Sequence, residues 1–115
     1  MDITAKQALD LWRGVMVEAL KADFPDLTSR QFALLMHVYL TPAPHTVRGL
    51  AEELNMSKPA VTRALDRLTR YDYIRRKTDE SDRRSVLVQR TIAGSVFLRT
   101  YGDMIESYAS EKLQD

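Results

Sequence analysis

The chain has 115 residues, of which 44% are hydrophobic and 29% charged, so its size and composition predict one globular domain over residues 1–115. It contains no cysteine, which excludes disulfides, cysteine-ligated zinc fingers and thiol nucleophiles. No apolar run reaches the roughly 18 residues of a membrane span and no signal peptide is evident, so we expect a cytoplasmic protein without membrane contact.

The positive charge is concentrated in one stretch, although the net charge of the chain is only +1. Residues 57–90 contain ten Lys or Arg and five Asp or Glu, which gives them a net charge of +5. Residues 1–56 and residues 91–115 each carry a net charge of −2. Clustered cations favour contact with nucleic acid, because neutralising phosphates releases counterions. The alternative is an ordinary solvated charged face.

The first two predicted elements are amphipathic helices. Over residues 3–22, apolar residues recur at three- and four-residue spacing. Residues 28–31 have the form of a capping box for a second helix, which must end before Pro42 and Pro44 because proline lacks the donor N–H. The second helix is predicted to bury Phe32, Leu35, Met36, Tyr39 and Leu40.

Residues 46–68 have the pattern of a helix-turn-helix. Thr46 and Ser57 are good N-caps for two helices, and residues 55–56 form the turn between them. Pro59 falls in the first turn of the second helix, where its missing N–H has no intrahelical acceptor. This second helix has one aliphatic face and one polar, cationic face, a pattern that suits insertion into a DNA major groove. An ordinary surface helix is the alternative interpretation.

After this helix the periodicity changes to that of strands. Residues 74–77 and 85–89 are predicted to be short strands joined by a polar loop that carries Arg83 and Arg84. Such a hairpin after a helix-turn-helix is a wing, and its arginines suit a narrow minor groove. Asp82 is placed to pair with Arg84, although surface ion pairs usually contribute little to stability.

A last helix begins after Thr91, which is its predicted cap. Its apolar stripe exceeds what one small core needs, and the first helix offers a second such face. We therefore expect the terminal helices to form an interface with a partner. The predicted interface residues are Trp12, Val15, Phe97, Tyr101, Ile105 and Tyr108.

Catalysis and metal binding find little support in the sequence. His37 and His45 are the only histidines, and no carboxylate stands at a spacing that would complete a metal site with them. Glu52 and Glu53 are adjacent, so they point in different directions on a helix. No glycine-rich phosphate loop occurs. We therefore expect no metal, no cofactor and no enzymatic activity.

Residues 50–68 and 79–88, followed by Thr91 and Gly94, resemble the helix-turn-helix and wing of the MarR family of prokaryotic transcription regulators. The resemblance implies a mainly α-helical, winged helix-turn-helix fold with a small β-hairpin wing. It also implies a DNA-binding lobe over residues 28–90, with dimerisation helices at residues 1–24 and 91–115.

This resemblance further implies a homodimer that binds double-stranded DNA at a palindromic operator, with small aromatic acids as candidate effectors. Arg90 departs from the family pattern, which usually has an aliphatic residue there, so the exit from the wing is expected to differ. The alternative is a winged-helix protein-interaction module with only weak or non-specific DNA binding. The positions that map to DNA contacts are Ser57, Lys58, Pro59, Thr62, Arg63, Arg67, Asp82, Arg83 and Arg84.

Overall fold

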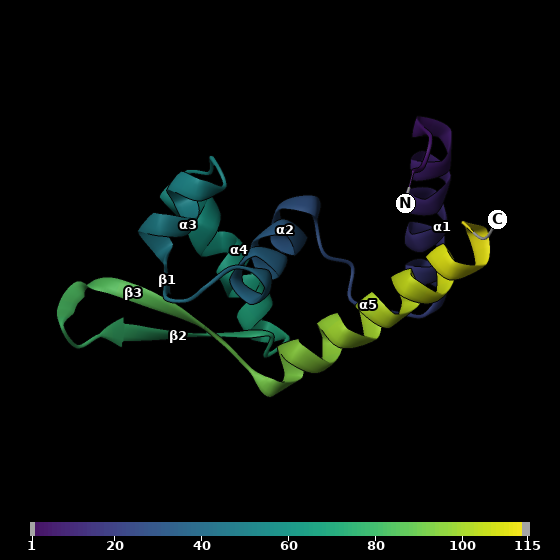
Figure 1. Ribbon diagram of the computed structural model, residues 1–115. Helices are drawn as coiled ribbons and strands as arrows, with labels where there is room; N and C mark the ends of the chain where they lie inside the picture. Colours follow the sequence, from purple (N-terminus) through teal and green to yellow (C-terminus); the bar gives the residue numbers. More distant parts are fainter. Residues whose placement is uncertain (1, 114–115) are drawn as a thin grey trace. The chain divides into compact units, whose positions relative to one another are not determined.

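The computed structural model describes residues 2–113, which form five α-helices and one small antiparallel sheet (Figure 1). The elements are α1 (Ala5–Lys21), α2 (Ser29–Leu40), β1 (His45–Thr46), α3 (Val47–Glu53), α4 (Lys58–Arg70), β2 (Ile74–Asp79), β3 (Asp82–Arg90) and α5 (Ile92–Lys112). The predicted mainly α-helical fold with a hairpin wing is confirmed. The outermost ends of the predicted terminal segments, residue 1 and residues 114–115, lie outside the described residues.

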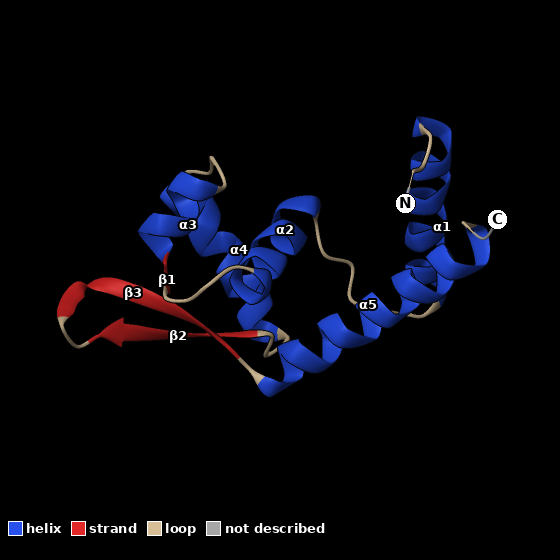
Figure 2. Ribbon diagram, in the orientation of Figure 1, coloured by secondary structure: helices blue, strands red, loops and turns tan. Residues whose placement is uncertain are grey.

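The described residues divide into two compact units, one formed by residues 27–97 and one by residues 2–26 together with 98–113. The first unit contains the helix-turn-helix and the wing, and we call it the lobe. In the lobe, helices α2, α3 and α4 lie together, and the hairpin of β2 and β3 projects beyond them (Figure 2). Its fully buried large side chains are Leu34, Leu35, Val38, Leu50, Val61, Leu65, Leu68 and Ile74.

Helix α2 begins and ends where the sequence predicts, but its buried face is partly different. The predicted capping box is present: the Thr28 hydroxyl accepts the Gln31 N–H at 3.1 Å, and the Gln31 side chain accepts the Thr28 N–H at 2.9 Å. The prediction that Leu40 is buried is wrong, because its side chain is 77% exposed. Leu40 lies two residues beyond the buried Val38, which places it roughly 200° around the helix, on the opposite face.

The helix-turn-helix is built by the two predicted caps. The Thr46 hydroxyl accepts the Gly49 N–H at 3.0 Å, and the Ser57 hydroxyl accepts the Ala60 N–H at 3.2 Å. Between the helices, Asn55 has a φ of 52°, in the left-handed region that asparagine tolerates better than most residues. The turn therefore reverses the chain without glycine, and α4 starts immediately after it.

The sheet has the order β1-β3-β2, and both long strands extend further than predicted. Their pairing runs from Ile74 opposite Arg90 to Asp79 opposite Asp82, so only residues 80–81 form the connecting turn. The prediction of a longer polar loop at this place is wrong. The part of the hairpin near the turn has no apolar face to bury. Its residues therefore lack the alternation of apolar and polar side chains by which a strand is predicted from sequence. Strand β1, which was not predicted, pairs His45 with Val88.

The second unit consists of α1 and the part of α5 beyond residue 97. Thr4 caps α1 in a capping box with Gln7. The Tyr108 ring lies so close to Gly14 that a Cβ there would overlap it, and Phe24 contacts Tyr101 with ring centroids 5.4 Å apart. No helix within residues 2–113 is long and apolar enough to cross a membrane.

Candidate nucleic-acid interface

Helix α4 is amphipathic, with one face held firmly in the lobe core. Val61, Ala64, Leu65 and Leu68 are all buried, as the sequence predicts. Removing a buried leucine side chain of this kind costs about 2–5 kcal/mol, so the orientation of the helix about its axis is strongly fixed. The opposite face must therefore point to solvent.

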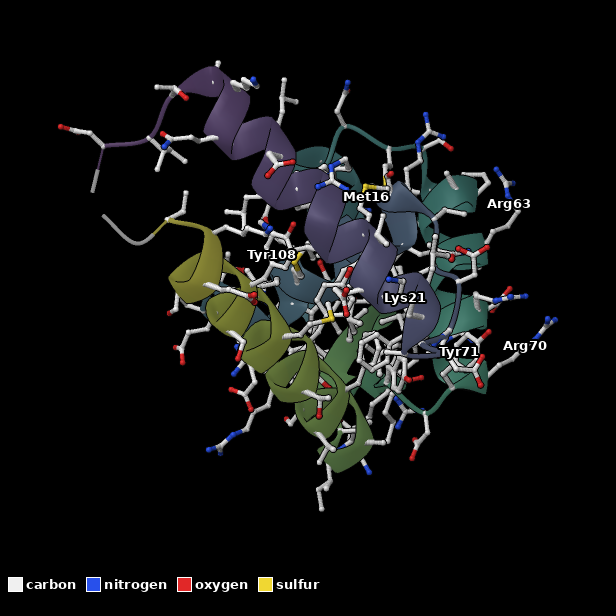
Figure 3. The ribbon with its side chains drawn as sticks, turned by 90° about the vertical axis from the view of Figure 1, so that its right-hand side faces the viewer. Met16, Lys21, Arg63, Arg70, Tyr71 and Tyr108 are labelled. Atoms are coloured by element: carbon white, nitrogen blue, oxygen red, sulfur yellow. The ribbon has the colours of Figure 1, made fainter. Side chains whose placement is uncertain are left out.

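The six predicted contact residues are all exposed: five lie in α4, and Ser57 is its N-cap. Figure 3 shows Arg63 extending outward from α4, with Arg70 extending in the same direction two turns later. Arg70 was not among the predicted contacts. It lies seven residues after Arg63, and this spacing places both side chains on the same face of a helix. The predicted residues are Ser57, Lys58, Pro59, Thr62, Arg63 and Arg67.

The cations of this surface differ in how they are held. The Arg67 guanidinium lies over the Tyr71 ring, 5.5 Å from its centroid. Arg76 of β2 pairs with Asp66 of α4 at 2.8 Å, which offsets the one acidic side chain on the exposed face of the helix and ties the helix to the wing. Among residues 2–113, by contrast, no carboxylate lies within ion-pair distance of Arg63. Its charge is therefore available to another molecule.

The tip of the hairpin is ordered by two aspartates. The Asp79 carboxylate accepts both the Ser81 hydroxyl at 2.7 Å and the Ser81 N–H at 3.0 Å, and these bonds lower the pKa of Asp79. The Asp82 carboxylate accepts the Arg84 N–H at 3.1 Å. The predicted Asp82–Arg84 ion pair is loose, at 3.8 Å, and the Arg84 side chain is 95% exposed. Arg83 is exposed as well, so the wing presents two solvated cations.

Arg90, the departure from the family pattern, anchors the base of the wing. Its guanidinium donates to the carbonyl oxygens of Val38 at 3.0 Å and Thr41 at 3.1 Å, and it lies over the Tyr39 ring. These carbonyls are at the C-terminal end of α2, where backbone acceptors lack partners within the helix. The cation therefore joins the wing to α2, a role that sequence reasoning missed.

The predicted interface residues of the terminal helices are of two kinds. Val15 and Phe97 are buried, and Phe97 stacks on Tyr73 of the lobe with ring centroids 4.5 Å apart. Trp12, in contrast, is 61% exposed. Tyr101, Ile105 and Tyr108 are half-buried. The exposed apolar side chains that accompany Trp12 on α1 are Leu9, Met16 and Leu20.

A cavity of about 460 Å³ lies between α1 and α5 in the same unit. Three cations, Arg13, Lys21 and Lys112, line it together with Glu18 and Glu111. Arg13 pairs with Asp10 at 2.8 Å, and this pairing raises the pKa of Arg13 and lowers that of Asp10. Tyr108 and Met104 contribute apolar surface to its wall.

The two histidines lie next to a carboxylate that the spacing of residues along the chain did not indicate. His37 contacts the Glu53 carboxylate directly, and one ligand-type atom from each of His37, His45 and Glu53 lies within 4.8 Å of the others. In the sequence, Glu53 was considered only beside Glu52, from which it points away on a helix. The fold brings α2, β1 and α3 together at this point.

This fold and its exposed cationic surface define the class of winged helix-turn-helix proteins. The MarR family matches residues 27–86, which is more than half of the chain. The chain therefore belongs to the MarR family of winged-helix transcription regulators.

Solved structures agree with this fold. A MarR mutant from E. coli complexed with operator DNA is 24% identical, with a TM-score of 0.70 over 92% of this chain and 74% of that one. An S. aureus MepR–DNA complex is 19% identical, with a TM-score of 0.69 over 94% and 80%. A transcriptional regulator from Thermotoga maritima is 22% identical, with a TM-score of 0.72 over 96% and 80%. No curated protein matches the chain.

Proposed function

We propose that the chain is a homodimeric regulator of transcription that binds specific DNA sequences, with α4 in the major groove and the hairpin in the minor groove. The observation that carries this proposal is the exposed N-terminal half of α4, where Lys58, Thr62 and Arg63 project from a helix whose other face is fixed in the core. Arginine can bond bidentately to guanine in the major groove, and threonine can reach base edges there.

The wing supports the same proposal. Arg83 and Arg84 are exposed at the end of a hairpin that Arg76 and Arg90 hold to the helices of the lobe. Two of the similar solved structures are complexes with DNA, one of them with operator DNA. Arginine in a narrow minor groove gains from the enhanced negative potential there, so the wing is suited to reading A·T-rich flanks.

We propose that residues 1–24 and 91–115 dimerise the chain, while residues 28–90 bind DNA. Exposed Leu9, Trp12, Met16 and Leu20 on α1 form an apolar surface larger than scattered surface residues would give. A two-fold dimer is the commonest oligomer, and it places two recognition helices on half-sites about one DNA turn apart. The operator is then palindromic.

Selection of bound sequences from a random duplex pool tests the proposal. We expect an enriched palindrome whose complex survives excess non-specific competitor DNA. The alternative, a protein-interaction module, predicts no enriched motif and binding that competitor removes. The second outcome would overturn the assignment even if the protein retains weak affinity for DNA through its basic surface.

We propose small aromatic acids as the effector class to test first. The cations of the α1–α5 cavity could pair with a carboxylate, while Tyr108 and Met104 offer apolar contact. A panel of phenolic acids at millimolar concentration should raise the melting temperature and change the DNA affinity. If both quantities stay constant across the panel, this effector class should be abandoned.

A further inference from the structure

Three side chains with metal-binding groups converge inside the lobe, from three different elements. His37 lies in α2, His45 in β1, and Glu53 is the last residue of α3. One ligand-type atom from each lies within 4.8 Å of the other two, and the two imidazole rings are 5.7 Å apart between centroids. All three belong to the same compact unit, so their arrangement does not depend on how the two units are placed.

The cluster has a fixed inner side and an open outer side. His45 is only 6% exposed, and its strand is held in register opposite Val88. The Glu53 side chain is 53% exposed, and His37 is partly exposed. An ion can therefore reach the cluster from solvent, while the innermost ligand stays in place.

A backbone carbonyl also orients the buried histidine. The His45 Nε2 atom lies 3.2 Å from the Thr41 carbonyl oxygen, so it can donate its proton there. In the neutral ring this leaves the lone pair on Nδ1 for an ion. Histidines that bind metals usually donate their second ring N–H to a carbonyl or carboxylate in this way, which fixes tautomer and orientation.

We propose that His37, His45 and Glu53 form a binding site for a divalent transition-metal ion of the Zn²⁺ class. Two imidazole nitrogens and one carboxylate oxygen are ligands that suit zinc, whereas magnesium and calcium require more oxygen ligands. Bonds of about 2.0–2.2 Å put the ligand atoms of a tetrahedral zinc site about 3.3 Å apart. Metal binding therefore requires the ligand atoms of His37 and Glu53 to move apart, with the ion in place of the hydrogen between them.

The ion would join α2, β1 and α3 just before the turn that leads into α4. A ligand that binds only the folded chain stabilises it in proportion to the logarithm of its concentration. Zinc at about 100 times its dissociation constant should therefore raise the melting temperature by about 5–15 °C. Binding at this site is independent of whether the chain recognises DNA.

Zinc titration of the full, untagged, chelator-treated chain tests the site. Calorimetry should give one Zn²⁺ per chain, and Glu53→Gln and His37→Gln should each weaken binding by about tenfold or more, since each removes one of three ligands. Glu52→Gln is the matched control, because it removes the adjacent carboxylate, which is not in the cluster. Equal binding by parent, Glu53→Gln and His37→Gln, or no binding by the parent at 100 times the protein concentration, would overturn the site.

Two measurements on the unsubstituted chain keep the test valid if a variant fails to fold. His37 and His45 are the only histidines of the chain, so the NMR signals of both rings should shift together on zinc addition. Co²⁺ in place of zinc should give the intense visible absorption of four- or five-coordinate cobalt. Unshifted histidine signals, or a spectrum identical to that of cobalt in water, would contradict the proposal.

Discussion

The arginines of the lobe serve two different purposes. Arg90 and Arg76 bind partners within the chain, at the carbonyls that end α2 and at Asp66 respectively, so they hold the wing in place. Arg63 and Arg84 instead extend into solvent from α4 and from the wing. Charge alone does not distinguish the two groups in the sequence. The contacts of each arginine in the structure do distinguish them, and they identify Arg63 and Arg84 as the side chains to test for DNA contact.

Replacing Arg63 with Ala should cost about 1–3 kcal/mol of binding free energy on the selected operator, because a bidentate contact to guanine is lost. The loss on scrambled DNA should be smaller. Fluorescence anisotropy with both duplexes measures the difference. Arg30→Ala is the matched control, since Arg30 is an exposed arginine at the start of α2 and is not one of the predicted DNA contacts.

Replacing Arg84 with Ala should weaken binding to operator and scrambled DNA alike. The slope of log affinity against log salt concentration should fall in magnitude by about one, since one phosphate-neutralising cation is removed. Preference for A·T-rich flanks should also relax. A salt series on duplexes with A·T-rich and G·C-rich flanks checks both effects, and an unchanged slope would contradict the assignment of the wing.

At the scale of elements, the junction between wing and α5 is closely packed. The Tyr39 hydroxyl accepts the Thr91 N–H at 2.9 Å and donates to the Tyr73 carbonyl oxygen at 2.7 Å. Thr91 caps α5 by accepting the Gly94 N–H at 2.9 Å. A Cβ on Gly94 would overlap both the Tyr39 hydroxyl and the Tyr73 carbonyl oxygen.

Gly94→Ala should therefore lower the free energy of unfolding by about 1–3 kcal/mol, because overpacking outweighs the gain in helix propensity. Gly102→Ala in the same helix is the control: a Cβ there meets nothing within 4 Å. That substitution should be neutral or stabilising by up to about 1 kcal/mol. Urea denaturation of both variants gives the comparison, and equal stabilities would contradict this packing.

Elements that depend on residues near one another in the sequence could be predicted from it. Elements that depend on contacts between residues far apart in the sequence could not. Ser57 and Thr28 cap their helices through residues three positions away, so short sequence patterns reveal them. His45 enters a strand only because Val88 lies opposite it, forty-three residues later. The contact of His37 with Glu53 joins two helices, and the contacts of Arg90 join a strand to a helix, so both likewise depend on residues far apart in the sequence. The candidate DNA contacts on α4 were predictable because one face of a single helix carries them.

For the whole molecule, sedimentation tests whether α1 supplies a dimer surface. At micromolar concentration the chain should sediment at twice 13.2 kDa. Trp12→Ala should raise the dimer dissociation constant, because a large exposed aromatic would lose its burial against the partner. Leu40→Ala is the control, since this side chain is also apolar and exposed but lies in the lobe. A monomer throughout the concentration range would refute the dimer.

Sequence-specific DNA binding through α4 is tested most directly by one comparison of affinities. The affinity of the parent chain for the selected operator and for a scrambled duplex should be measured at several salt concentrations. We expect a preference of at least about 10³-fold for the operator that persists as salt rises, and a large loss of that preference in Arg63→Ala. Equal affinity for both duplexes, or an Arg63→Ala variant that discriminates as well as the parent, would contradict it.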